Sequence, residues 1–327
     1  MKALGLASRK LANRPIAGEK AALATLNSFL SERGRNYRKG MSSPITGEVM
    51  CSRISPYLSA GCLTIKQVFH HTVNRQRQIK VDPRSSENLG FTSSLTSFQS
   101  RLAWHCHFMQ RLEAEATMDE VAINPELDEL LNRQLDQRKF IAWRDGKTGW
   151  PFFDACMRYL TATGWINFRM RAMLQSVASY TLWLPWQATG THLANLFMDY
   201  EPGIHWSQVQ MQSGVTGINS VRAYSVGKQS TDHDPDGEFI RRWVPELSSV
   251  PAEHIHEPWL MTLVEQEQYN CRIGIDYPEP IVDEKAARKS GISRSYKAKS
   301  DAAVKRRAKI VFDIHGSRSR QSGRSRN

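Results

Sequence analysis

The twenty residues Gly146–Trp165, GKTGWPFFDACMRYLTATGW, fix the start, length and end of one helix. Thr148 suits the N-cap, and Pro151 suits the first turn, where a backbone N–H has no partner to lose. Gly164 is placed to end the helix, because glycine adopts the left-handed backbone of a C-terminal cap. Between these signals, large apolar side chains recur at helical spacing: Trp150, Phe153, Met157 and Leu160. The chain should therefore fold around buried helices.

Helical patterns also dominate the rest of the chain, and strand signals are scarce. Apolar residues share one face over 19–33, 95–116, 126–137 and 168–184, and the segment beyond Pro56 is also expected to be helical. Residues 37–51 and 81–90 are predicted as polar loops, since glycine and proline interrupt them. We predict an all-α fold with three parts: a flexible basic N-terminus (1–14), one helical domain (15–283) and a C-terminal tail (284–327).

Positive charge is concentrated at the C-terminal end. Residues 284–327 hold fourteen Lys and Arg against three Asp and Glu, whereas the preceding residues hold thirty against twenty-nine. Such a Ser-rich, basic segment has little apolar surface to bury, so we predict a disordered tail. Tails of this kind contact nucleic-acid phosphates without reading sequence, and the simpler alternative is a solubilising end.

Cysteine usage and hydropathy exclude several classes of protein. The five cysteines form no C-x-x-C pair, which argues against a disulfide framework and a zinc or iron–sulfur site. His105 and His107 would point apart on a helix, so no metal is expected. No apolar run is long enough to span a membrane, and the N-terminus lacks the apolar core of a secretory signal. A cytoplasmic protein is expected, associated with the nucleoid if bacterial; an organelle or the nucleus stays open.

One acidic stretch looks like a metal site and is not interpreted as such. Asp232-His-Asp234-Pro-Asp236-Gly237 resembles the start of an EF-hand loop, but Trp243 stands where the bidentate Glu is needed. We interpret it as a turn whose acids precede a helix N-terminus, where the helix dipole favours negative charge.

Six motifs follow one another in the order typical of a known family. They are CSRISPYLSAG from Cys51, Leu102-Ala-Trp104, GKTGWP from Gly146, Trp165–Arg171, GEFIRRWVPEL from Gly237 and YPEPIVD from Tyr277. The chain resembles the FAD-binding helical domain of the cryptochrome/photolyase family over residues 15–283. The family's N-terminal α/β antenna domain is not part of the resemblance, so no antenna pigment is implied.

The resemblance implies a set of FAD contacts. Tyr37 matches a tyrosine at the cofactor edge, and a helix N-terminus with hydroxyls suits the diphosphate; the matching loop residues are Ser52, Arg53, Ile54 and Ser55. Taken without the resemblance, that loop is better explained as an ordinary serine cap. Further matches surround the flavin ring: the pair Arg171 and Asp199, Glu201 at the ring edge, and His205 facing flavin N5.

The resemblance also implies contacts with damaged DNA. Trp104 matches a tryptophan that packs against a flipped pyrimidine dimer, although a core tryptophan is the alternative. Other positions match residues that face the lesion or the DNA phosphates: Arg101, Arg169, Arg222 and Gln229. Trp186 matches the middle member of an electron-transfer chain of tryptophans.

Several positions depart from the repair enzymes. Arg101 replaces a glutamate, Phe168 an asparagine, Asn167 the histidine of the (6-4) repair class, and His205 an asparagine; Met211 and Val209 replace tryptophans. Trp183, Trp206 or Trp143 could restore the electron route.

The leading expectation is a monomeric lyase in which light-excited reduced FAD donates an electron to a pyrimidine photoproduct in DNA. The alternatives are a cryptochrome-like blue-light receptor and a nucleic-acid-binding helical domain without a cofactor.

Overall fold

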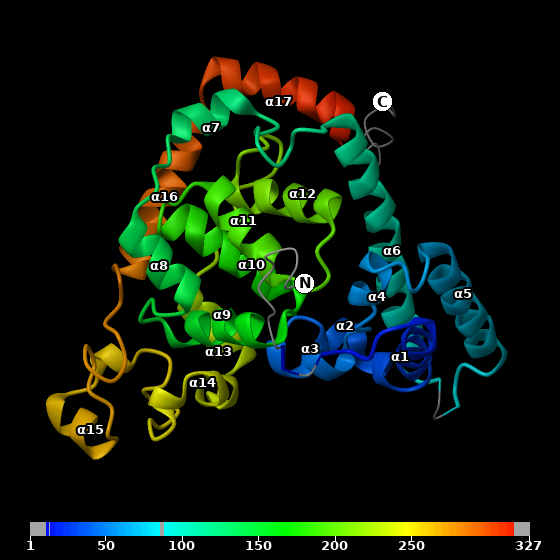
Figure 1. The fold of residues 1–327 in the computed structure, drawn as a ribbon, viewed down its shortest axis with the longest axis horizontal. Coiled ribbons are helices and arrows are strands. Elements are labelled where there is room, and N and C mark those ends of the chain that lie inside the picture. Colours follow the sequence, from blue (N-terminus) through cyan, green and yellow to red (C-terminus); the bar gives the residue numbers. More distant parts are fainter. Residues whose placement is uncertain (1–10, 13, 86–87, 317–327) are drawn as a thin grey trace, which may run out of the picture.

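The computed structural model describes residues 11–12, 14–85 and 88–316, and the elements over these ranges are helices (Figure 1). A single isolated bridge joins Ile273 to Tyr277, and the described residues contain no sheet. The predicted all-α fold is confirmed. Over the same residues, no helix combines the length and apolarity needed to cross a bilayer.

One core lies among the N-terminal helices. Phe29, Tyr37 and Phe98 meet here, with ring centroids 4.8–6.1 Å apart. The elements are α1 (Glu19–Ser31), η2 (Arg33–Asn36), α2 (Tyr37–Gly40), α3 (Pro44–Met50), α4 (Ser55–Ser59), α5 (Ile65–Val81) and the long α6 (Phe91–Ala114).

The loop predicted over residues 37–51 is instead largely helical, as α2 and α3. Ser43 caps α3 by accepting from the backbone N–H of Ile45 at 3.3 Å, and Pro44 occupies the first turn. The glycines and the proline that suggested a loop therefore mark helix boundaries and close contacts.

The largest core surrounds α9 (Pro151–Thr163). Its predicted apolar face is buried, and Gly164 ends the helix with φ 72°, as predicted. Thr148 is not the N-cap; that position is Trp150, while the Thr148 hydroxyl donates to Asp154 at 2.7 Å. Around α9 lie α8 (Gln137–Asp145), α10 (Phe168–Ser176), the π-helical turn η3 (Val177–Thr181), α11 (Trp186–Leu196), α13 (Val226–His233) and α14 (Glu238–Trp243). The helix α12 (Pro202–Ser213) packs against α6, α10 and α11.

A peripheral segment follows α14 and contains η4 (Pro245–Leu247), η5 (Pro258–Leu260) and α15 (Leu263–Gln268). It returns to α9 at Tyr277, whose hydroxyl donates to the buried Asp154 carboxylate at 2.6 Å. Four residues on, the Ile281 N–H donates to the Thr148 carbonyl at 2.8 Å. These bonds attach the far end of the segment to the start of α9.

The acidic turn before α14 has the predicted role. The Asp234 carboxylate accepts from the N–H groups of Phe239 at 3.0 Å and Ile240 at 2.9 Å, in the first turn of α14. This pairing satisfies two donors that a helix N-terminus leaves free.

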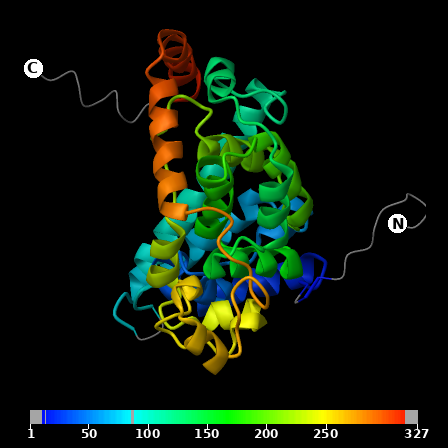
Figure 2. The same cartoon turned by 90° about the vertical axis from the view of Figure 1, so that its left-hand side faces the viewer.

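The prediction of a disordered C-terminal tail is wrong for residues 284–315. They form α16 (Glu284–Lys299) and α17 (Ala302–His315), which pack with α7 (Pro125–Leu131) around a third core (Figure 1). Val304 and Val311 are buried in it. Figure 2 shows α16 standing along one edge of the molecule, with α17 at its end. Residues 317–327 of that predicted tail lie outside the described residues, as do 1–10 and 13 of the predicted flexible N-terminus.

Candidate flavin site

The predicted phosphate loop, Ser52–Ser55, leads directly into α4. Arg53 adopts a left-handed backbone with φ 61°, and its guanidinium lies 3.7 Å from the ring centroid of Trp165. Ile54 is buried, while Ser52 and Ser55 are half-buried. The loop thus places two hydroxyls and a cation at a helix N-terminus, an arrangement suited to a phosphate group.

Arg33, the first residue of η2, holds this loop in place. Its Nη1 donates to the carbonyls of Val49 and Cys51 at 2.8 and 2.7 Å, and its Nη2 donates to that of Ser52 at 3.2 Å. A cleft of about 420 Å³ beside the loop is lined by Arg14, Ile16, Thr25, Arg53 and Tyr57, among others.

Arg171 and Asp199 form the central ion pair of the site. Nη1 and Nη2 of Arg171 donate to Oδ1 and Oδ2 of Asp199 at 3.0 and 2.8 Å, the two-pronged geometry that makes such pairs strong. Arg171 also donates from Nε to the Ile166 carbonyl at 2.7 Å, and its guanidinium lies 4.2 Å from the Phe197 ring centroid. The predicted pair is therefore assembled in the structure.

His205, in the first turns of α12, is buried near this pair. Burial lowers the pKa of His205 to about 4, while its bond to the Gly190 carbonyl opposes the shift. Its Nε2 lies 2.9 Å from that carbonyl, which can only accept, so Nε2 carries the proton. Nδ1 of the neutral ring is therefore an acceptor. Glu201, the N-cap residue of α12, is half-buried.

Tyr37 and Cys51 lie between the loop and α6. Burial raises the pKa of Tyr37 to about 12, an effect opposed by the Arg101 guanidinium. Burial likewise raises the pKa of the Cys51 thiol to about 11, against the nearby guanidinium groups of Arg53, Arg171 and Arg33. The site is thus a cluster of cations around neutral buried groups.

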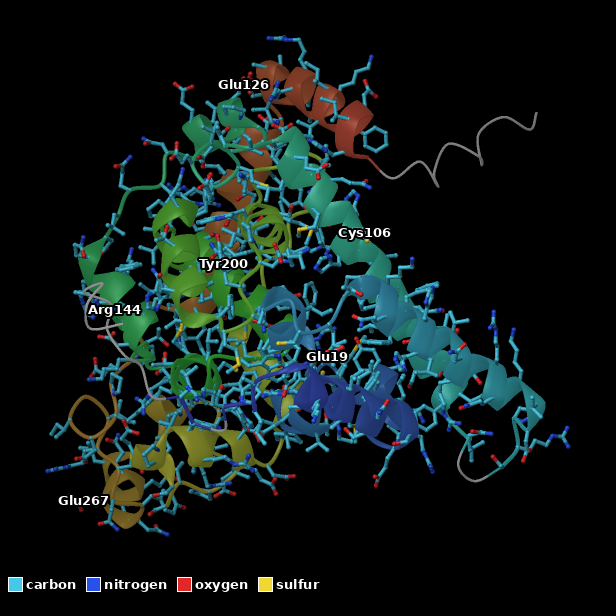
Figure 3. The ribbon with its side chains drawn as sticks, turned by 45° about the vertical axis from the view of Figure 1, so that its right-hand side comes forward. Glu19, Cys106, Glu126, Arg144, Tyr200 and Glu267 are labelled. Carbon is cyan, nitrogen blue, oxygen red and sulfur yellow. The ribbon has the colours of Figure 1, made fainter. Side chains whose placement is uncertain are left out.

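An exposed aromatic rim borders this cluster. Trp104, on α6, is 49% exposed, and Phe168, at the start of α10, is 53% exposed. The Arg101 guanidinium lies 5.9 Å from the Phe168 ring centroid, one helical turn from Trp104. The core interpretation of Trp104 is therefore wrong. Figure 3 shows Tyr200 beside α12 and Cys106 on α6, the two helices next to this rim.

The other predicted DNA contacts differ in how far their side chains are exposed. Arg222 is exposed and Arg169 half-buried. Gln229 is buried at 7% exposure, and its Oε1 is fully buried, so little of this side chain is available for the expected DNA contact.

Trp186 is fully buried and contacts a second tryptophan. Its Nε1 donates to Asp128 Oδ2 at 3.0 Å, and its ring centroid lies 6.0 Å from that of Trp206. Trp206 in turn lies 4.9 Å from the His205 ring centroid and donates from Nε1 to the Tyr200 hydroxyl at 3.1 Å. Trp183, Trp206 and Trp143 were the three tryptophans considered for the electron route. Of these, Trp206 contacts both Trp186 and His205.

Sequence reasoning missed Arg33 and Phe197. Arg33 follows a predicted helix and carries no motif, and Phe197 precedes Asp199 without any charge pattern. Their roles depend on contacts between segments that are distant in the sequence. The only sequence signal was that each lies within four residues of a matched position, Tyr37 or Asp199.

The residues present fit a flavin dinucleotide. Three polar atoms of the cluster are buried and make no hydrogen bond within the described chain: Arg53 Nη1, Asn167 Oδ1 and Arg169 Nε. A ligand or water that offers matching donors and acceptors would satisfy these three atoms. Two donors and an acceptor match the mixed polarity of such a ligand.

Comparisons with known proteins agree with this geometry. The family model described as the FAD binding domain of DNA photolyase matches residues 98–297. A deoxyribodipyrimidine photo-lyase of Alkalihalophilus pseudofirmus is 32% identical over 84% of this chain and 55% of its own length. A cryptochrome DASH of Synechocystis is 31% identical over 81% of this chain and 53% of its own.

A solved structure is also similar. The Synechocystis cryptochrome superposes with a TM-score of 0.77 at 26% identity, covering 88% of this chain and 58% of that one. The chain spans about half the length of the curated relatives it matches. It belongs to the cryptochrome/photolyase family, and its helices form that family's FAD-binding domain.

Proposed function

We propose that this domain carries out light-driven repair of UV-induced pyrimidine photoproducts in DNA, as a photolyase-type lyase. The observation that carries the proposal is the half-exposed Trp104, held beside the flavin cluster. Its neighbours on α6, His107 and Phe108, lie at ring-centroid distances of 5.7 and 5.6 Å and support the indole from one side. The exposed 49% of Trp104 is the surface on which a base would stack.

The cofactor supplies light absorption and electron exchange, and the protein supplies position and electrostatics. Arg171, fixed by Asp199, provides a positive charge beside the ring site. His205 contributes a neutral acceptor at Nδ1, because its other nitrogen donates to Gly190. Trp104 offers a flat apolar face for an extruded base, whose unpairing costs least at a damaged site.

A blue-light receptor without repair activity is the second candidate. It is favoured by the rim itself, where Arg101 and Phe168 occupy positions that hold glutamate and asparagine in repair enzymes. Their contact fills part of the rim with the chain's own side chains. The buried pair Trp186 and Trp206 would serve flavin reduction in either candidate.

The test is lesion loss in UV-irradiated oligothymidine and in a (6-4)-containing oligonucleotide, in blue light and in darkness, with the flavin reduced. Light-dependent loss in the wild type, abolished in Trp104→Ala with flavin content unchanged, is the expected result. Flavin-loaded protein that repairs neither lesion overturns the repair proposal and leaves the receptor.

A further inference from the structure

The helix α16 is fixed against the body of the domain by a seam of small residues. Gly291, Ser295 and Ala298 are buried, and a Cβ at Gly291 would lie 2.0 Å from the Tyr180 carbonyl oxygen. Only glycine permits this approach of two backbones. The orientation of α16 about its own axis is therefore set.

The face opposite this seam is cationic. At about 100° per residue, the outward arc carries six exposed residues: Lys285, Ala286, Lys289, Ser293, Tyr296 and Lys297. In the described part of the chain, these three lysines make no ion pair. The helix thus presents fixed charges without acidic partners.

On α17, cations are exposed together with the apolar side chains of Ile310, Phe312 and Ile314. Val304 and Val311 face the core, and Lys305, Arg306 and Lys309 are exposed, again without an ion pair among the residues described. Two nearby acids are engaged: Glu284 accepts from Arg288 at 2.8 Å, and Asp301 caps α17. A third acid, Asp313 on α17, is exposed.

This surface begins next to a predicted DNA contact. Lys299 of α16 donates to the Asn219 carbonyl, and the Arg222 carbonyl three residues on accepts from Ser176 at 2.8 Å. The exposed Arg222 side chain therefore lies on the segment that α16 packs against.

We propose that the outward faces of α16 and α17 bind the phosphate backbone of nucleic acid outside the flavin site. We call the six exposed cations the α16–α17 ridge: Lys285, Lys289, Lys297, Lys305, Arg306 and Lys309. The inference rests on the proposed function only in that the bound polymer is DNA.

The spacing of the ridge suits this partner. Lys285 and Lys297 are separated by about 18 Å along the helix axis, the rise of about five base pairs. Between the lysines, α16 presents Ala286, Ser293 and Tyr296 and no large aliphatic side chain. A helix that inserts into a membrane surface needs an apolar face, so nucleic acid is the better match for α16.

The test uses the full flavin-loaded chain in darkness with an undamaged duplex. The ridge variant Lys285→Gln/Lys289→Gln/Lys297→Gln is compared with Lys20→Gln/Lys66→Gln/Lys80→Gln, which removes the same charge from exposed positions on α1 and α5. Affinity is measured by fluorescence anisotropy over a series of salt concentrations.

The ridge variant is expected to lose about tenfold or more in affinity at low salt, and the slope of log affinity against log salt should fall by about 0.9 per lost phosphate contact. Equal affinity and slope in the two triple variants would overturn the proposal. So would wild-type binding to phosphatidylserine vesicles, but not DNA, that the ridge variant loses. Because the probe carries no lesion, failure of repair leaves this result unaffected.

Discussion

Arg171 and Asp199, twenty-eight residues apart, are joined by two parallel hydrogen bonds that tie α10 to the loop before α12. The Asp199 side chain is 3% exposed and that of Arg171 is 25% exposed. The buried Asp199 carboxylate therefore holds the partly exposed Arg171 guanidinium in place. The pair also fixes α10 relative to α12, two of the helices that carry the candidate flavin site.

Replacing Asp199 should weaken FAD binding and destabilise the fold more than replacing the acid of a surface ion pair does. Asp199→Asn leaves the guanidinium opposite a neutral amide, and we expect a loss of about 3 kcal/mol in the free energy of unfolding and about tenfold weaker FAD binding. The measurements are urea unfolding and flavin titration. As a control, Asp145→Asn in the exposed Arg144–Asp145 pair should cost less than about 1 kcal/mol. Equal effects in both variants would contradict this role of Asp199.

His205 should make the domain sensitive to mild acid. Its pKa is lowered to about 4 in the folded protein, against about 6.5 unfolded, so the unfolded chain binds the extra proton. The stability is complete above pH 6.5 and is lost as pH falls toward 4, by about 3 kcal/mol in all. Urea unfolding of wild type and His205→Asn across this window tests it: the variant should show a shallower dependence.

Gly291→Ala should dislodge α16. The added Cβ meets the Tyr180 backbone, which cannot move aside, and we expect destabilisation by about 1–3 kcal/mol. Gly227, on α13, is the matched control, because a Cβ there meets nothing within 4 Å. Gly227→Ala should instead stabilise by about 0.5–1 kcal/mol. Thermal unfolding of both variants distinguishes them, and a neutral Gly291→Ala would refute the close contact.

Trp206→Phe should slow the light-driven reduction of the bound flavin by an external thiol. The smaller ring widens the gap between Trp186 and His205, and electron transfer slows with distance. Trp259→Phe, in the η5 turn, should leave the rate unchanged. Absorbance spectroscopy under blue light gives both rates. If the two variants reduce at the same rate, the route does not pass through Trp206.

Local signals predicted several helices of the body well, because the residues that begin and end those helices lie close to them in the sequence. Gly164 ends α9, and Asp234 accepts from two N–H groups in the first turn of α14, through bonds that span only a few residues. The C-terminal helices were missed because the disorder argument weighs apolar area. Gly291 and Ala298 contribute almost none, yet they let α16 approach the body closely.

The candidate site could be predicted only where a motif fixed a position. The Arg171–Asp199 pair came from a family resemblance, and the structure assembles it. The burial of Gln229 and the contact of Trp206 with Trp186 could not be anticipated, since both depend on how distant helices pack.

The attachment of Tyr277 to Asp154 bears on how this chain can change in length. At the near end of the peripheral segment, the Trp243 ring lies 5.0 Å from that of Tyr159 on α9, so both ends are anchored to one helix. The segment is therefore a long loop whose two ends are both held on α9. Lengthening such a loop costs little entropy. Residues can therefore be inserted or lost around α15 while α9, and the flavin site built on its neighbours, keeps its register.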